Sequence, residues 1–597
     1  MLKKHAPFPF NLAHISLAFV GLMWVLPFLY YHHAYPITTF YQEWGAGLLG
    51  LCALPLLLTA RYWQAPEVPR IVMLPIGLML LLMIQFFVGR IEHFDHLMLM
   101  SLYFLFAALL MMLGRHLRAE LGLPTVATVL AVFLLAGAEL NTLAGFLQHY
   151  RWNTFLNPFV TLKTSVAVYG NTAQPNHYAS YLSFGLISLG LLHVRLSMRA
   201  WQTALLAAPM LFVMALSGSR SSWLYLLFVA GLAFWVQKRD RAARPLLYYS
   251  LLLVLGFWQM HYVVQIPWLE GSTGSVTTAE RLFGDNASGS IRVQLWREAS
   301  LIFAQFPLLG AGFGQFAFQH LQLAVEMHNP GIVGLYNNAH NLVMQTAAEA
   351  GTAGLIVLLL TLGMWLWQAF ARGAQWTIYQ WWGYAVLAVL GIHSMLEYPL
   401  WYAYFVGVAA FMLGMFDVTG YRLELRNVGR VSVALMLLLG ALSLLQVHLA
   451  YQRLENALLL RGKAVADRSL IPRVQEELMK VHESALLSSY AEMFIANTME
   501  IGPDHLQEKS QLNERVMRFI PIAPVVYHQA LLLAMSDKPE EAKAMMEKAI
   551  WGYPADYLRA RVEMEDLARK DPARFAPLLE FATQKIEEYR SAAIPAK

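Results

Sequence analysis

Long apolar segments separated by short polar turns fill the first three quarters of the chain. Thirteen of these segments approach the roughly 20 mostly apolar residues that cross a bilayer as a helix. The predicted spans are 13–31, 43–60, 71–89, 97–113, 125–146, 177–194, 201–217, 221–237, 246–264, 342–371, 380–396, 400–416 and 431–449. The pattern therefore predicts an all-α polytopic membrane domain over residues 1–449 and a soluble α-helical domain over residues 450–597.

The composition agrees with this division. Of the 597 residues, 58% are hydrophobic and only 14% are charged, whereas soluble domains carry about 25% charged residues. The net charge of +5 indicates no nucleic-acid partner, because basic residues in a membrane protein act chiefly as topology signals. Cys52 is the only cysteine, so an intrachain disulfide and a multi-cysteine metal site are both excluded.

Basic residues predict which side of the membrane each loop occupies, because cytoplasmic loops carry an excess of Lys and Arg. With Lys3 and Lys4 inside, that side holds 16 basic residues. The opposite loops hold seven, namely Arg90, Arg151, Lys163, Arg220, Arg281, Arg292 and Arg297. This orientation places the long loops 147–176 and 265–341 outside, together with the C-terminal domain. For a bacterial inner-membrane protein, that side is the periplasm.

Five polar segments converge on the predicted outer face. They are GNTAQPNHYAS (170–180), SGSRSS (217–222), IRVQLWREAS (291–300), YNNAHN (336–341) and LEYPLWYAY (396–404). None of them is a specific catalytic signature by itself. Their convergence on one side predicts a functional site at the membrane surface.

Arg220 lies in an outer loop of about four residues, so its guanidinium is held at the membrane interface. It can act as a snorkelling anchor for a helix end. Anchoring arginines belong mostly on the inner side, however, and this one is outside. The N–H groups of Ser217, Gly218 and Ser219 could also cradle an anion at the start of the next helix. We therefore favour Arg220 as an anion ligand.

Helical periodicity separates Arg292 from Arg297. An apolar stripe is formed by Leu295, Trp296, Ala299, Ile302, Phe303 and Phe306. Arg292 falls in line with this stripe and needs a partner there. Arg297 points away, beside Glu298, and is expected to be solvated. The preceding stretch 271–290, rich in Gly, Ser and Thr, predicts a mobile loop that could serve as a lid.

His340 lies just before the apolar run 342–371. Asn337 or Asn338 can cap that helix, which would place His340 in its first turn. The helix dipole there disfavours imidazolium, and a neutral ring can accept a proton. A lone histidine is usually structural, but two outward arginines favour a base beside an anion clamp.

Other polar residues of this face could each have either a binding role or a structural role. Gln174 and Asn176 could bind a polar ligand or satisfy the loop backbone. Tyr398 could belong to an interfacial aromatic belt or contact a sugar. The residues expected to support the site are Asn341, Glu349 and Glu397.

These residues together predict a reaction. Two arginines can neutralise a diphosphate, a neutral imidazole can deprotonate a hydroxyl, and the membrane surface can present a lipid with an outward head. We therefore expect glycosyl transfer from a polyprenyl-diphosphate sugar, with guanidinium groups stabilising the leaving diphosphate. No nucleotide-binding loop, metal-ligand cluster or Ser-His-Asp order is evident, so no metal or other cofactor is expected.

Several motifs resemble the bacterial O-antigen ligase and polymerase superfamily, namely SGSRSSWL, SIRVQLWREA with FPLLGAGFGQF, and NNAHNLVMQTAAEAGTAGL. GNTAQPNHYASYL and HSMLEYPLWYAYF narrow the resemblance to O-linked protein oligosaccharyltransferases of the PglL or pilin-glycosylase type. The resemblance covers roughly residues 150–420. It implies a GT-C-like glycosyltransferase fold in the inner membrane, with a periplasmic active site.

The resemblance also implies a reaction and roles for five residues. An oligosaccharide would pass en bloc from undecaprenyl diphosphate to a Ser or Thr hydroxyl of a pilin or another periplasmic protein. His340 matches the family's essential histidine, and Arg220 and Arg292 match its donor-phosphate arginines. Gln174 and Tyr398 match residues associated with protein glycosylation.

Alternatives remain open for the acceptor and for the C-terminal domain. The acceptor could be lipid A core or the growing polysaccharide, as in O-antigen ligases and polymerases. The non-enzyme alternative is a transporter, although transporters tend to place polar groups near the midplane. The stretch HQALLLAMSDKPEEAKAMMEKAIWGYP predicts a tetratricopeptide-like helix pair. Acceptor docking and a structural cap are both compatible with it.

Overall fold

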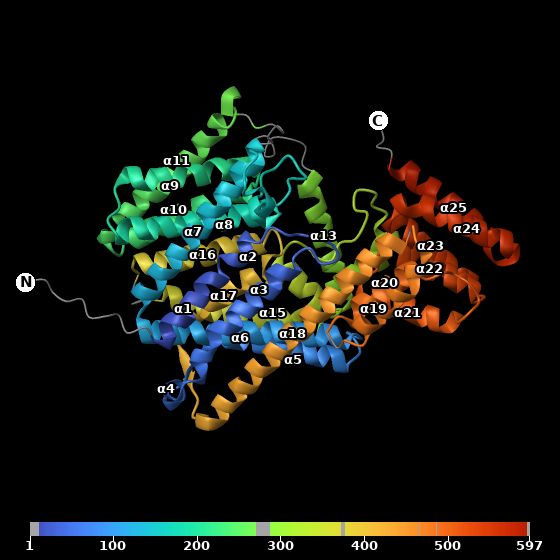
Figure 1. The fold of residues 1–597 in the computed structure, drawn as a ribbon, viewed down its shortest axis with the longest axis horizontal. Coiled ribbons are helices and arrows are strands. Elements are labelled where there is room, and N and C mark those ends of the chain that lie inside the picture. Colours follow the sequence, from blue (N-terminus) through green and yellow to red (C-terminus); the bar gives the residue numbers. More distant parts are fainter. Residues whose placement is uncertain are drawn as a thin grey trace, which may run out of the picture. The chain divides into compact units, whose positions relative to one another are not determined.

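The computed structural model describes residues 11–269, 271, 287–371, 376–464, 466–484 and 486–593. Within these ranges the chain is nearly all helical, as predicted (Figure 1). Two short strands, β1 (Glu67–Pro69) and β2 (Gly420–Arg422), pair antiparallel. Most of the stretch 271–290, predicted as a mobile lid, lies outside the described residues.

The chain forms two compact units. The first consists of Met1–Gly77, Leu102–Asn286 and Leu358–Leu444, and the second of Leu78–Ser101, Ala287–Val357 and Leu445–Lys597. The second unit therefore combines the C-terminal helices with two segments from the predicted membrane domain. The predicted domain boundary at residue 449 stays a prediction.

The helices of the first unit are α1 (Leu12–Met23), α2 (Leu26–Leu29), α3 (Phe40–Ala53), α4 (Ala60–Gln64), α7 (Leu123–Tyr150), α8 (Pro175–Arg195), α9 (Ala200–Leu216), α10 (Ser221–Gln237), α11 (Arg244–Val263), α16 (Ile378–Ser394) and α17 (Ala403–Phe416). Four helices have residues in both units, namely α5 (Met73–Phe87), α6 (Phe94–Leu121), α15 (Leu342–Phe370) and α18 (Arg426–Ala464). The second unit adds α13 (Ala287–Gln305), α14 (Phe316–Met327), α19 (Ile471–His482), α20 (Ser488–Thr498), α21 (Leu506–Phe519), α22 (Ala523–Met535), α23 (Pro539–Gly552), α24 (Tyr557–Lys570) and α25 (Pro572–Ala593).

Each of the thirteen predicted spans overlaps a helix. Among the described residues, seven helices are long and apolar enough to cross a membrane, which agrees with a multi-pass membrane protein. α9, α10 and α17 are apolar but shorter, at 17, 17 and 14 residues. The count of thirteen spans stays a prediction.

Helix α8 lies at the centre of the first unit. Its residues from His177 to Leu192 are all buried, and it packs against α7, α9, α10, α11 and α16. Because neighbours surround it, α8 can carry serine, histidine and tyrosine side chains that would be costly in contact with lipid. Its N-terminal end is where the predicted site residues of this helix lie.

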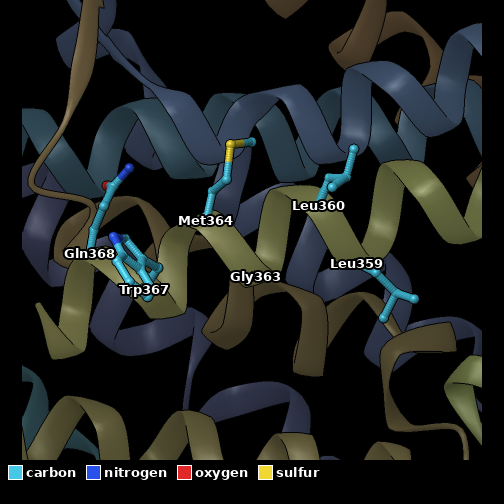
Figure 2. Close-up of a pocket in the computed structure, with 6 residues that line it drawn as sticks. All are labelled: Leu359, Leu360, Gly363, Met364, Trp367 and Gln368. Atoms are coloured by element: carbon cyan, nitrogen blue, oxygen red, sulfur yellow. The ribbon is translucent and has the colours of Figure 1, made fainter.

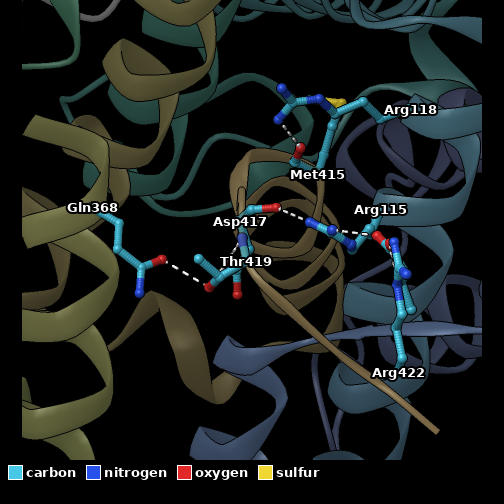
Figure 3. Close-up of polar contacts among 8 residues, drawn as sticks. Arg115, Arg118, Gln368, Met415, Asp417, Thr419 and Arg422 are labelled. Carbon is cyan, nitrogen blue, oxygen red and sulfur yellow. Dashed lines mark hydrogen bonds and ion pairs between the residues drawn. The ribbon is translucent and has the colours of Figure 1, made fainter. Parts of the chain in front are cut away.

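Polar contacts join several loops that the charge pattern assigns to one side of the membrane (Figure 3). The Arg115 guanidinium donates to the Asp417 carbonyl and pairs with the Glu67 carboxylate. Arg422 lies 3.5 Å from the same carboxylate, and Arg118 donates to the carbonyl of Met415 at 2.8 Å. Three of the loops predicted to be cytoplasmic are therefore held together at one end of the first unit.

Helix α15 is interrupted at Gly351, where φ is 62° and ψ is −160°. The break releases backbone groups that the preceding loop satisfies. Ala311 N donates to Ala348 O at 2.9 Å, and Thr352 N donates to Pro307 O at 2.8 Å. Gln85 Nε2 donates to Glu349 O at 2.7 Å. The motif FPLLGAGFGQF thus serves as a hydrogen-bonding partner for a broken helix, which is needed where water is scarce.

The C-terminal helices contain the helix pair predicted from the sequence. α22 and α23 pack together across a turn that ends at Pro539. Their core also includes Leu321 of α14, and Gly334 N donates to Gly552 O at 2.7 Å. The C-terminal helices therefore support the segment that leads to His340.

The outward side of α15 is apolar. A shallow depression of about 290 Å³ lies along it, lined by Leu359, Leu360, Gly363, Met364, Trp367 and Gln368 (Figure 2). None of these residues is a predicted site residue. The large exposed side chains suit contact with lipid tails.

Two glycines of α15 provide a matched test of the break. Alanine at Gly351 would be strained at positive φ, and its Cβ would lie 2.5 Å from Gly310 N. At Gly363 a Cβ meets nothing within 4 Å. We expect Gly351→Ala to lower stability by about 1–3 kcal/mol, and Gly363→Ala to raise it by about 0.4–1 kcal/mol. Thermal unfolding of the two variants in detergent checks this; equal melting temperatures would refute the strained break.

Candidate active site

The predicted site residues fall into two groups, one in each compact unit. The first unit holds Gln174, Asn176, Arg220, Glu397 and Tyr398, and the second holds Arg292, His340, Asn341 and Glu349.

Asn176, in the first turn of α8, joins three polar segments of the first unit. Its Nδ2 donates to Glu397 Oε1 at 3.0 Å. Its Oδ1 accepts a hydrogen bond from the Ser219 hydroxyl at 2.8 Å. One carboxamide therefore links the start of α8, the loop before α10 and the turn after α16. Those are three of the five segments that the sequence predicts to form a site.

Gln174 caps α8. Its Oε1 accepts a hydrogen bond from His177 N at 2.6 Å, and Pro175 occupies the first helical position. The reading in which this side chain satisfies backbone is therefore confirmed for its carbonyl oxygen. Binding of a polar ligand by Gln174 or Asn176 stays a prediction.

Arg220 is half-buried and directly precedes the first residue of α10. The expected cradle of backbone N–H groups before it is wrong. The N–H groups of Ser217 and Gly218 donate to carbonyls in the last turn of α9, and Ser219 N donates to the Ser217 hydroxyl at 3.2 Å. The chain uses these amides to end α9, so an anion would meet the guanidinium rather than a backbone nest.

Glu397 and Tyr398 lie in the turn between α16 and α17. Glu397 is buried, and its backbone N–H donates to His393 O at 2.8 Å. Tyr398 stacks on Tyr402, with ring centroids 6.0 Å apart. Burial, and then the charge of Glu397, raise the pKa of Tyr398. The phenol therefore stays protonated at neutral pH and able to donate a hydrogen bond.

A buried polar cluster lies one turn along α8 from Asn176, and the sequence prediction missed it. The Ser180 hydroxyl lies 2.8 Å from His393 Nδ1 and 3.2 Å from the Tyr225 hydroxyl, and it donates to Asn176 O at 3.0 Å. These side chains come from α8, α16 and α10, the same elements that Asn176 links. The spacing of four residues between Asn176 and Ser180 could have indicated a shared face.

In the second unit, His340 has a left-handed backbone with φ 51°. Its N–H donates to Asn338 Oδ1 at 2.7 Å. The cap of α15 is Asn341, whose Oδ1 accepts hydrogen bonds from the N–H groups two and three residues later at 3.0 and 3.1 Å. The expected caps, Asn337 and Asn338, are therefore wrong, and His340 precedes the helix instead of lying in its first turn.

Both backbone polar groups of Ala339 are hydrogen-bonded to side chains. Its N–H donates to Gln345 Oε1 at 2.7 Å, and its carbonyl accepts from Trp296 Nε1 at 3.0 Å. Trp296 belongs to α13, one turn after Arg292. These contacts hold the backbone beside His340 and tie it to the helix that carries Arg292.

Helix α13 confirms the separation of its two arginines. Arg292 is half-buried, whereas Arg297 is exposed. Glu298, read from the sequence only as the neighbour of Arg297, is buried and pairs with His320 Nδ1 at 2.7 Å. The His320 ring also packs in a T-shaped arrangement with Tyr336, which leads into the His340 loop.

Glu349 is buried and accepts a hydrogen bond from Phe316 N at 3.0 Å, at the start of α14. This contact links α15 to the start of α14. Within the ranges that the structure describes, no group of three or more His, Cys, Asp and Glu side chains is arranged to hold a metal ion.

Three family matches cover the segments that hold the predicted site residues. Residues 168–193 match a protein glycosylation ligase family, and residues 205–359 match the O-antigen ligase family. Residues 381–566 match the C-terminal part of a virulence factor membrane-bound polymerase family. The matched ranges contain every predicted site residue of both groups.

Two curated relatives come from Acinetobacter baylyi. A general O-oligosaccharyltransferase is 27% identical over 415 residues, which are 68% of this chain and 70% of the relative. A ComP-specific O-oligosaccharyltransferase is 23% identical over 249 residues, which are 41% of this chain and 43% of the relative. Together with the family matches, these relatives show that the chain is similar to O-antigen ligases and O-oligosaccharyltransferases, and they support a glycosyltransferase.

Proposed function

We propose that this chain transfers an oligosaccharide en bloc from undecaprenyl diphosphate to the hydroxyl of a Ser or Thr residue in a pilin or another periplasmic protein. The membrane domain would have a GT-C-like fold in the bacterial inner membrane, with the active site and the C-terminal domain in the periplasm. The observation that carries the proposal is the Asn176 carboxamide, which joins the segments of Arg220 and Tyr398. The matched protein glycosylation ligase and O-antigen ligase families support it.

Arg220 and Arg292 are proposed to bind the donor diphosphate. Arginine binds phosphate oxygens through several N–H donors in a fixed plane. Negative charge grows on the diphosphate as its bond to the sugar breaks, so cations fixed in advance stabilise the transition state more than the ground state. No nucleotide sugar is required, because the lipid-linked donor is already activated.

His340 is proposed to activate the acceptor. The acceptor oxygen attacks the anomeric carbon, the bond from that carbon to the diphosphate breaks, and the hydroxyl proton passes to the imidazole. The hydrogen bonds on either side of Ala339 hold the backbone beside the ring, which favours a defined orientation for proton transfer. Asn341 and Glu349 support this segment, and Gln174, Asn176, Glu397 and Tyr398 would contact the acceptor or the glycan.

Polysaccharide polymerisation is the second candidate, because residues 381–566 match a polymerase family. Ligation to lipid A core uses the same chemistry with a third acceptor. The break in α15 is a feature found in transporters as well, but the matched families are ligase and polymerase families. The match of residues 168–193 to a protein glycosylation ligase family favours a protein acceptor here.

The first test is glycosylation of a co-expressed pilin in cells that make a lipid-linked glycan, read by intact mass spectrometry. We expect a glycan-sized mass increase with the native chain. His340→Ala should lower transfer by about 10²-fold or more if the ring acts as a general base.

His505→Ala is the matched control, because His505 also has a left-handed backbone, with φ 52°, and lies at the start of α21. It should transfer at the native rate at equal membrane abundance. Glycan on lipid A core, or longer polysaccharide without pilin modification, would move the proposal to another acceptor. Full transfer by His340→Ala would remove the proposed role of the ring.

The two arginines are tested by a double-mutant cycle. Arg220→Gln and Arg292→Gln should each lower kcat/KM by about 10²-fold, as expected for loss of a charge-stabilising donor. If both guanidinium groups act on one diphosphate, the double variant should lose less than the product of the single losses.

Arg297→Gln is the control, because Arg297 is exposed on the same helix as Arg292. Turnover of purified lipid-linked donor is measured for the native chain and for all four variants. Losses that multiply independently would show that the two arginines act at separate steps or on separate groups.

A further inference from the structure

The segment between α7 and α8 exposes a set of large apolar side chains, and the proposed chemistry does not use them. We call residues 151–166 the interfacial loop. The relative exposures are 52% for Trp152, 85% for Phe155, 57% for Phe159, 81% for Leu162 and 42% for Val166. Large apolar side chains exposed together in one short segment can mark a binding surface for protein or membrane.

The backbone of the interfacial loop is held firmly by buried carboxamides. Gln148 Nε2 donates to Thr161 O at 2.8 Å. Asn171 Nδ2 donates to Phe159 O at 2.8 Å, and Asn171 Oδ1 accepts from Thr161 N at 3.0 Å. These bonds leave the loop little freedom to fold its apolar side chains inward. The exposure of these apolar side chains therefore follows from the hydrogen-bonded backbone of the loop.

The position of the loop along the chain sets its position relative to a bilayer. It begins at Arg151, whose left-handed backbone with φ 51° ends α7. α7 is one of the helices long and apolar enough to cross a membrane. The loop therefore starts at the membrane surface, where aromatic side chains are enriched. Two aromatic side chains lie at this point, where Trp152 stacks on Tyr150 with ring centroids 5.0 Å apart.

Two basic residues frame the apolar side chains. Burial, and then the charge of Arg151, lower the pKa of Lys163, so the two cations lie within electrostatic reach of each other. Phospholipid phosphates supply negative charge at the depth where an interfacial loop lies.

We propose that the interfacial loop inserts Phe155, Phe159 and Leu162 into the adjoining leaflet of the bilayer, with Arg151 and Lys163 at the level of anionic lipid headgroups. The occupant of this surface is thus lipid, not the acceptor protein. Because Asn171 holds the loop and lies just before α8, insertion would fix the depth of the helix end that carries Asn176. The inference does not depend on the transfer chemistry.

The test uses the full-length protein with Cys52→Ser, so that a single introduced cysteine can carry an NBD fluorophore. Phe155→Cys and Leu162→Cys report on the loop. Leu143→Cys, on the exposed side of α7, is the lipid-facing control, and Ser591→Cys, on exposed α25, is the water-facing control. Each labelled protein is reconstituted into nanodiscs that contain phosphatidylglycerol, and quenching by acyl-chain nitroxide lipid and by aqueous iodide is measured.

The proposal predicts that labels at Phe155 and Leu162 respond as at Leu143, with several-fold stronger nitroxide quenching and weaker iodide quenching than at Ser591. Replacing phosphatidylglycerol by a zwitterionic lipid, or introducing Lys163→Gln, should reduce nitroxide quenching at Leu162. Iodide quenching equal to that at Ser591 would overturn the proposal. So would a label that becomes shielded only when an acceptor protein is added, since that would make the surface a protein-docking site.

Discussion

A polar group that a helix bundle removes from water must find its hydrogen-bond partners within the protein. The half-buried Asn176 meets this requirement by accepting from Ser219 and donating to Glu397. Those two bonds reach the neighbours of Arg220 and Tyr398 in the sequence. The proposed diphosphate ligand and the proposed glycan contact of the first unit therefore depend on one side chain for their relative placement.

The second unit meets the same constraint with backbone groups. The break of α15 at Gly351 leaves carbonyls that the 307–312 loop and Gln85 satisfy. In the same unit, the side chains of Trp296 and Gln345 form hydrogen bonds with the backbone of Ala339, beside His340. A helix that is interrupted and re-bonded in this way gives the proposed base a rigid support, which proton transfer in a defined geometry requires.

The apolar pattern predicted where the helices lie, because burial in lipid or in a bundle demands continuous apolar runs. The same pattern separated exposed Arg297 from half-buried Arg292. It did not predict the break at Gly351, since an alanine- and glycine-rich run reads as one continuous span. Nor did it choose correctly among the asparagines of YNNAHN, because each can cap a helix and only tertiary contacts decide. Glu298 was missed as a buried partner, although it lies three residues after Leu295 and four before Ile302 on the apolar stripe.

The placement role of Asn176 is tested most directly by exchanging its hydrogen-bond partners. Asn176→Asp places two carboxylates next to each other. Glu397→Gln in the same chain restores a hydrogen-bond donor and an acceptor to this pair. Turnover of purified lipid-linked donor should fall in Asn176→Asp and recover in the double variant, with a coupling of about 0.5–3 kcal/mol. Native turnover in Asn176→Asp, or losses that simply add in the double variant, would contradict the account.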